Sequence, residues 1–188
     1  MDKNVSIYWI RQDLRLHDNP ALKAAVNNGA IVPIYILDDI NSGEHKLGSA
    51  SRIWLHHSLE KLNKQFKNKL HFFNADPLQV ISEICETEKI YKVYWNRVYE
   101  PWCIQRDKKI KETLNLKGIE TNSFNGSLLW EPWEVLKNDG TPYRVFTPYY
   151  RRGCLNAVGP RIPTKAPQKI KYYEFQKIKS LDIESLNL

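Results

Sequence analysis

The feature that most constrains this chain is a regular alternation of short apolar runs with segments of helical period. Apolar runs of strand length occupy residues 5–10, 30–37, 70–74, 92–95 and 119–124. Helical segments begin at Pro20, near Ser49, at Pro77 and near Pro101. Because a strand–helix–strand series pairs its strands in parallel, this order predicts an α/β fold, with a Rossmann-like, doubly wound, five-stranded parallel sheet and helices on both faces.

Local signals support these helices. Asn19 and Asp76 are good N-caps, each followed by a proline at the first helical position, and Gly29 is a stop signal. The helix from Ser49 has one apolar stripe with spacings of four, three and four residues, formed by Leu55, Leu59, Leu62 and Phe66. Pro33 is the one conflict, since proline is disfavoured in a central strand. We expect it near the strand's entry or at a bulge.

The pattern changes after the fifth predicted strand. From Ser127 we expect a turn at Asp139-Gly140 and no long helix. Aromatic residues are frequent there and are more often core than ligand stackers; they are Trp130, Trp133, Tyr143, Phe146, Tyr149 and Tyr150. Residues 154–188 are rich in proline and lysine and are interpreted as an extended linker. Residues 1–153 are therefore the predicted α/β domain.

Composition narrows the class of protein. The net charge of +7 suits either a nucleic-acid or acidic ligand or a general lysine bias, so it decides neither. Three cysteines are too few and wrongly spaced for a disulfide framework or a CxxC metal site. No run is long enough to span a membrane, and the N-terminus lacks the regions of a signal peptide. We expect a cytoplasmic protein with no membrane partner.

A ligand of an open α/β sheet usually lies beyond the carboxyl ends of the strands, where the strand order reverses. The loops after the first, second and fourth predicted strands should meet there. We therefore expect Arg11, Arg15, Asp38 and Glu100 to converge on one rim. No GxGxxG follows the first strand and no GxxxxGK[ST] occurs, which argues against a dinucleotide dehydrogenase or P-loop enzyme, and against a stand-alone nucleotide-binding protein.

Other site chemistries are weakly supported. The two arginines could grip a phosphate or carboxylate, or could form a salt-bridged loop, which is the favoured interpretation. The five histidines have no metal spacing, and adjacent His56 and His57 should point to different sides of their helix, so no metal site is predicted. No Ser-His-Asp or Cys-His set and no carboxylate pair can be recognised, so no catalytic residue is predicted. The residues thus predict an α/β ligand-binding domain.

Four segments carry a family resemblance. Residues 9–22, "WIRQDLRLHDNPAL", resemble the amino-terminal signature of the DNA photolyase/cryptochrome family, with Ile10 as the one departure. "PIYILD", "VYWNRVYEP" with the following Arg106-Asp107 pair, and "GTPYRVFTPYYRR" agree with later family segments in order and spacing. The resemblance covers nearly the whole chain.

The resemblance implies the amino-terminal antenna-binding domain of a deoxyribodipyrimidine photolyase, a carbon–carbon lyase. Such enzymes repair cyclobutane pyrimidine dimers in damaged DNA with light and reduced FAD. The FAD and most of the DNA-binding surface belong to a helical domain after the linker, which we expect to be absent here. The chain alone should then bind no FAD in the usual pocket and repair nothing. The alternative is a cryptochrome-like photoreceptor domain without repair activity.

The resemblance also implies an antenna chromophore. The segment "YWNRVYEP" is most similar to the branch that binds 8-hydroxy-deazaflavin, whose pocket positions match Tyr35, Leu37, Asp38, Arg52 and Glu100. Val98 departs, because that branch carries an acid there. Methenyltetrahydrofolate is less favoured, since the folate branch has an Asn-Glu pair where this chain has Trp102-Cys103. Flavin mononucleotide and an empty pocket stay open.

The missing helical domain is the expected partner of two segments, and damaged DNA would be bound through the full-length protein. The predicted domain-interface residues are Arg11, Asp13, Arg15, Tyr143, Phe146 and Pro148. We expect the first three to form mutual ion pairs and to contact "YRVFTPYY". Direct DNA contact by the linker lysines, Lys169, Lys171, Lys177 and Lys179, is less favoured than solvation.

Overall fold

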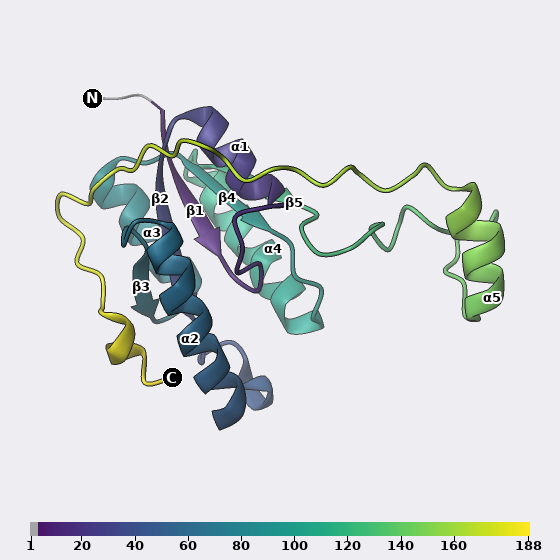
Figure 1. Cartoon of the computed structure of the whole chain (residues 1–188), viewed down its shortest axis with the longest axis horizontal. Coiled ribbons are helices and arrows are strands. Elements are labelled where there is room, and N and C mark those ends of the chain that lie inside the picture. The colour runs from purple at the N-terminus through teal and green to yellow at the C-terminus, as the bar shows by residue number, and fades with distance from the viewer. Residues whose placement is uncertain (1–3) are drawn as a thin grey trace.

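The computed structural model describes residues 4–188. Its centre is a five-stranded sheet in which every pair of neighbouring strands is parallel, in the order β3-β2-β1-β4-β5 (Figure 1). The strands are β1 (Val5–Ile10), β2 (Ala30–Leu37), β3 (His71–Asn74), β4 (Lys92–Asn96) and β5 (Glu120–Phe124). The helices are α1 (Pro20–Asn28), α2 (Ser49–Gln65), α3 (Pro77–Glu88), α4 (Pro101–Leu116) and the short α5 (Phe146–Pro148). The predicted fold is confirmed.

Helices cover both faces of the sheet. Along β1, Tyr8 and Ile10 pack into the core beneath α1 and α2, whereas Ile7 and Trp9 pack into the core beneath α3 and α4. This division follows from the two-residue period of a strand. The predicted stripe of α2 is buried in the first of these cores. A sheet apolar on both faces must be covered on both, and here α1 and α2 cover one face while α3 and α4 cover the other.

The helix starts agree with their sequence signals. The side chain of Asn19 accepts a hydrogen bond from the backbone N–H of Leu22 at 3.0 Å. The side chain of Asp76 accepts one from the N–H of Gln79, also at 3.0 Å. Each cap satisfies one of the N–H groups that the first helical turn leaves without a partner.

Pro33 corrects one expectation, because it lies inside β2, opposite Tyr8 of β1, and not at the strand's entry or at a bulge. On the other side of β2, pairing with β3 starts only at Ile34. Ile31 there exchanges backbone hydrogen bonds with residues 171 and 173. Backbone amides two residues apart on a strand point to the same side, so an N–H at position 33 would point to the same side as that of Ile31. There it would lie between the end of the pairing with residues 171 and 173 and the start of the pairing with β3. Proline therefore removes no ladder bond.

Residues 125–163 form an arm that projects from the sheet and carries α5 at its far end (Figure 1). The helical turns Tyr149–Gly153 and Cys154–Asn156 continue α5. The predicted turn is confirmed, with Gly140 at φ +78°. The expectation that the aromatic residues of this region are core is wrong for Trp133, Phe146 and Tyr150, which are 60%, 74% and 48% exposed. The arm is too thin to bury them.

The C-terminal segment, residues 164–188, is extended up to the helical turn Ile183–Leu186 and is packed onto the domain, whereas Cys154–Asn156, also inside the predicted extended linker of residues 154–188, is helical. We call residues 164–188 the strap. It runs back from the arm across the sheet to the β3 edge (Figure 1). Its attachment points are Asp18 with Thr164, Ile31 with Tyr172, Glu88 with residues 176–178, Phe72 with Leu181, and the buried side chain of Leu186. The strap therefore completes the core beside α2.

No helix in the described range 4–188 is long and apolar enough to cross a membrane. All three cysteines, Cys85, Cys103 and Cys154, are free and buried. This agrees with the expectation that they form no disulfide framework.

Candidate functional site

A cavity of ≈ 780 Å³ lies at the carboxyl ends of the strands. Here β2 and β4 leave β1 on opposite sides, so the strand order reverses as expected. The walls come from the ends of β1 and β2 and from the first turns of α2 and α4, and they are largely aromatic and aliphatic. They include Trp9, Tyr35, Leu37, Trp54, Val98 and Trp102. Its size and apolar walls are typical of a small-molecule site.

Four of the five predicted pocket residues line this cavity, namely Tyr35, Leu37, Asp38 and Glu100. Arg52 does not line it. Its guanidinium donates to Asp39 at 2.6 Å and to the carbonyl of Leu47 at 3.1 Å. Because Asp39 and Leu47 themselves line the cavity, Arg52 holds the loop after β2 in place from behind. The structure thus assigns it a positioning role.

A chain of alternating charges forms one end of the cavity. Arg106 donates to Asp38 at 2.9 Å and to Asp107 at 2.8 Å, and Asp107 in turn accepts from Arg11. Burial lowers the pKa of Arg11, even though Asp107 opposes that change. Burial would lower the pKa of Arg106 too, but the carboxylates of Asp107 and Asp38 outweigh it, so that pKa is raised. Both guanidinium groups therefore stay charged at neutral pH.

These arginines also pack on the aromatic wall. The guanidinium carbons of Arg11 and Arg106 lie 4.8 Å and 5.1 Å from the centre of the Trp9 ring, and Arg106 lies 5.0 Å from the Trp102 ring. Such stacking fixes the indoles. In the sequence, the Arg106-Asp107 pair is part of a family segment, and its spacing does not predict that it lies at the site. Only packing of α4 against the end of β1 brings it there.

Some buried polar atoms of the lining lack a partner within the described chain. One oxygen of Glu100 accepts from the side-chain amide of Gln12 at 2.7 Å, but the other oxygen is buried without a hydrogen bond, as is the hydroxyl of Ser42. Burial alone would raise the pKa of Glu100, but donation from Gln12 helps to hold it below its ordinary value. Since a buried polar group without a partner is costly, these atoms are suited to meet a ligand.

Asp13 is a buried hydrogen-bond hub beneath the loop after β1. Its carboxylate accepts from the Tyr8 hydroxyl at 2.9 Å, from the side chains of Asn19 at 3.0 Å and Asn96 at 2.6 Å, and from the Arg11 N–H at 3.1 Å. Burial, then the Asp13 charge, raise the pKa of Tyr8 well above its usual value, so its hydroxyl stays a donor. This hub ties β1, α1 and β4 together.

The expected mutual ion pairs of Arg11, Asp13 and Arg15 are not formed. Within the part of the chain that the structure describes, Arg11 pairs with Asp107, and Arg15 pairs with Asp18 at 3.9 Å. Arg15 also misses the cavity rim, because a tight turn at Asp13 sends it toward the arm. Nor does the cluster contact "YRVFTPYY", since α5 lies at the outer end of the arm (Figure 1).

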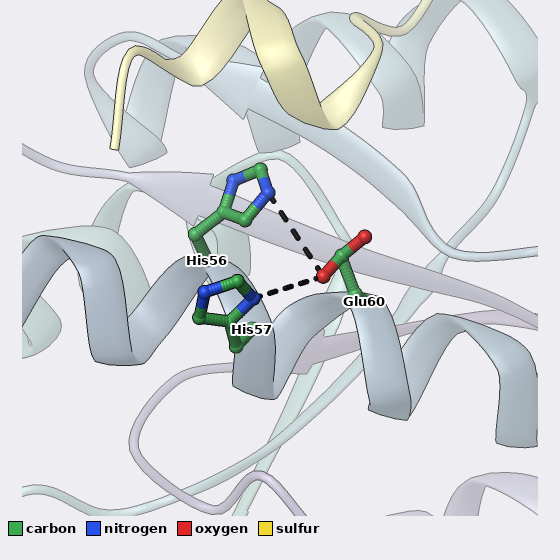
Figure 2. Close-up of side chains that lie close together, drawn as sticks. All are labelled: His56, His57 and Glu60. Carbon is green, nitrogen blue, oxygen red and sulfur yellow. Dashed lines mark hydrogen bonds and ion pairs between the residues drawn. The ribbon is translucent and has the colours of Figure 1, made fainter.

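The expectation for His56 and His57 also needs correction. Their rings do not diverge: the ring centres lie 5.4 Å apart, and one oxygen of Glu60, beside the two rings, contacts both (Figure 2). On a helix of 3.6 residues per turn, position i+4 lies about 40° from i and about 60° from i+1. Glu60 is therefore a neighbour of both histidines. The expectation that His56 and His57 point to different sides of the helix did not take this third residue into account.

Comparison with known proteins shows the family of the chain. The family model described as DNA photolyase matches residues 6–168. Cryptochrome-1 of Arabidopsis thaliana is 32% identical over 169 residues, which cover 88% of this chain and 25% of that protein. The deoxyribodipyrimidine photo-lyase of Agrobacterium fabrum is 35% identical over 168 residues, which cover 87% of this chain and 34% of that enzyme.

A solved structure supports the same relationship. A bacterial class III photolyase from Agrobacterium tumefaciens superposes with a TM-score of 0.88 at 32% identity, over 98% of this chain and 38% of that one. This chain thus spans between about a quarter and two fifths of the length of these relatives. Motifs, sheet order and matched length lead to one conclusion: the chain belongs to the DNA photolyase family.

Proposed function

We propose that this chain is an antenna-chromophore domain that serves a photolyase-type flavin domain in light-driven repair of pyrimidine dimers in DNA. The observation that carries the proposal is the ≈ 780 Å³ cavity with aromatic walls at the switch point of the sheet. A planar chromophore can stack on the exposed face of Trp54 and on Trp102. When bound, such a group absorbs light and passes the excitation energy on.

The charges around the cavity favour one class of chromophore. Both lining arginines are committed to aspartates, and Asp38, Asp39 and Glu100 add negative charge to the walls. A ligand with a phosphate would need a cation that is not already paired. We therefore infer that 8-hydroxy-deazaflavin suits this site better than flavin mononucleotide. Trp102 and Cys103 put an indole and a thiol where folate binding would use an amide and a carboxylate, so methenyltetrahydrofolate is the weaker fit.

Absorbance titration tests the chromophore role. The purified chain is mixed separately with 8-hydroxy-deazaflavin, flavin mononucleotide and methenyltetrahydrofolate, and the bound spectrum is recorded after gel filtration. Trp54→Ala should weaken deazaflavin binding about ten-fold, because one stacking face is lost. The matched control is Trp133→Ala, since Trp133 is similarly exposed, at 60% against 65%, but lies on the arm. Retention of none of the three compounds would refute the antenna role.

The exposed aromatic residues of the arm favour it as the surface for the helical flavin domain. Phe146 is 74% exposed and stacks on Tyr150 at 5.9 Å, and Val145 beside it is 63% exposed. Tyr143 and Pro148 belong to the same end of the arm. Arg11 and Asp13, in contrast, are buried inside the domain, so we propose that they support the interface only from beneath.

The test of this interface needs the full protein, which the DNA downstream of codon 188 would reveal. A following reading frame with flavin-domain motifs would give the full protein. In that protein, Phe146→Ser should weaken the attachment of the two domains and so speed cleavage between them in limited proteolysis. Leu116→Ser, on an exposed site of α4, should not. Equal proteolysis of both variants would exclude the arm as the interface.

A cryptochrome-like signalling role is the alternative function, because Cryptochrome-1 of Arabidopsis thaliana matches as large a share of the chain, 88%, as the photo-lyase of Agrobacterium fabrum does, at 87%. The two roles differ in whether the full protein repairs pyrimidine dimers in DNA. The chain alone, with reduced FAD and light, should leave cyclobutane pyrimidine dimers in DNA unrepaired. The full protein should remove them if it is a photolyase and leave them if it is a cryptochrome.

A further inference from the structure

One cluster of side chains lies outside the cavity and has no part in the proposed function. His56, His57 and Glu60 lie together on α2, directly after the helix residues that line the cavity (Figure 2). One ligand atom from each lies within 4.8 Å of the other two. Two imidazoles and a carboxylate are the donor types that bind zinc and its neighbours in the first transition series.

The distances are close to those of a coordination sphere. Nδ1 of His57 lies 3.1 Å and Nε2 of His56 lies 4.0 Å from the same oxygen, Oε2, of Glu60. Two donors bound to one zinc ion at about 2.0–2.1 Å each are roughly 3.3 Å apart in a tetrahedron. His57 and Glu60 already meet this value. The His56 nitrogen, at 4.0 Å from the Glu60 oxygen, would have to move closer to reach it.

The helix explains why the three groups meet. Glu60 projects from one turn further along α2, at an angle between the two histidines. Because side chains tilt toward the N-terminus of a helix, its carboxylate reaches back to both rings. The site is thus built within α2, a helix fixed by the buried Leu55, Leu59 and Leu62 on its opposite face.

Exposure and charge decide what kind of site this is. The side chains of His56, Glu60 and His57 are 24%, 40% and 65% exposed, so a cation can reach them from solvent. Three protein donors leave at least one position for water. Nearby Lys64 carries a charge of the same sign as the cation. The lysine reduces affinity without blocking access.

We propose that His56, His57 and Glu60 form a surface binding site for one divalent transition-metal cation such as Zn²⁺, Ni²⁺ or Cu²⁺. Hard cations are excluded by the donor set, since Mg²⁺ and Ca²⁺ take oxygen ligands and the cluster offers a single carboxylate. The site does not depend on the chromophore cavity. It would remain if the antenna role were refuted.

Calorimetric titration of the chain with ZnCl₂ tests this proposal, after removal of any histidine tag, because a tag would bind the same cations. We expect saturable binding of one equivalent of Zn²⁺ and none of Mg²⁺. His57→Ala and Glu60→Gln should each weaken Zn²⁺ binding at least about ten-fold, because even the loss of a residue that only supports a metal ligand lowers affinity by about ten-fold or more. The matched control is His17→Ala, which removes an exposed histidine of the loop after β1.

Imidazole NMR spectra give a second measurement that does not need the variants. Zn²⁺ should shift the ring signals of His56 and His57 while those of His17 and His45 stay in place. Both of these histidines are exposed and outside the cluster. Absence of saturable Zn²⁺ binding, or equal affinity of the wild type and Glu60→Gln, would overturn the proposal. So would equal shifts at all exposed histidines.

Discussion

Glu88, at the end of α3, is the group that most clearly fastens the strap. Its two oxygens accept from the backbone N–H groups of residues 176, 177 and 178 at 2.8–3.2 Å and from the Tyr173 hydroxyl at 3.0 Å. The residue is only 9% exposed. In Glu88→Gln one oxygen is replaced by an NH₂ group that faces N–H donors and cannot accept from them.

The size of the effect follows from these contacts. A hydrogen bond to a charged group contributes about 1.5–3 kcal/mol, and the substitution removes the charge from all four contacts. Because glutamine keeps one acceptor, we expect docking of the strap to weaken by about 2 kcal/mol. This corresponds to a population of the detached strap that is roughly 30-fold larger.

The same carboxylate gives docking a pH dependence. Burial would raise the pKa of Glu88, but the backbone N–H donors and the Tyr173 hydroxyl hold it below its usual value. A carboxylate with a lowered pKa in the folded state stabilises that state above its unfolded pKa of about 4.3. This contribution should therefore be complete at neutral pH and be lost as the pH falls below about 4.

Hydrogen exchange of the strap amides measures the prediction. In Glu88→Gln the amides of residues 176–178 and of Leu181 should exchange about 30-fold faster at pH 7, whereas the sheet amides should change little. Glu86→Gln is the matched control on the same helix, because Glu86 is exposed and pairs with the exposed Lys117, away from the strap. Unchanged exchange in Glu88→Gln, or an equal increase in the control, would refute the reasoning.

Further variants test other contacts. Gly126→Ala should destabilise the fold by several kcal/mol in urea unfolding, because its Cβ would lie 2.5 Å from Cγ of the buried Asn96; wild-type stability would contradict this close approach. Asp76→Ala should lose about 1 kcal/mol of stability with the cap on Gln79, and an unchanged urea midpoint would disprove that role. Burial raises the pKa of Cys103 to about 11, so iodoacetamide should modify it far more slowly at pH 8 than a free thiol, as mass spectrometry can measure.

Most of the sheet and its helices could be predicted because their signals are local. Asn19-Pro20 and Asp76-Pro77 mark helix starts by capping chemistry, which needs no tertiary contact. Pro33 shows the limit. Its tolerance inside β2 depends on where β3 begins and on which segment pairs with Ile31, and neither is visible in the neighbouring residues.

The candidate site was predicted in part for the same reason. Asp38 and Glu100 follow strand ends, so topology alone brings them to one edge of the sheet. Arg52 and Arg15 carry charges that suit a site, but the direction of each side chain depends on the loop that supports it. One stabilises Asp39 from behind the cavity and the other turns toward the arm.

The sequence by itself determined the order of the elements, the two apolar faces of the sheet and the family, because periodicity, capping and motif spacing are properties of neighbouring residues. Tertiary structure alone decided that Arg106 joins Asp38 and that the strap is held by Glu88. Each of these depends on directions and distances between side chains. Those are set only when helices pack on a twisted sheet, and spacing along the chain does not encode them.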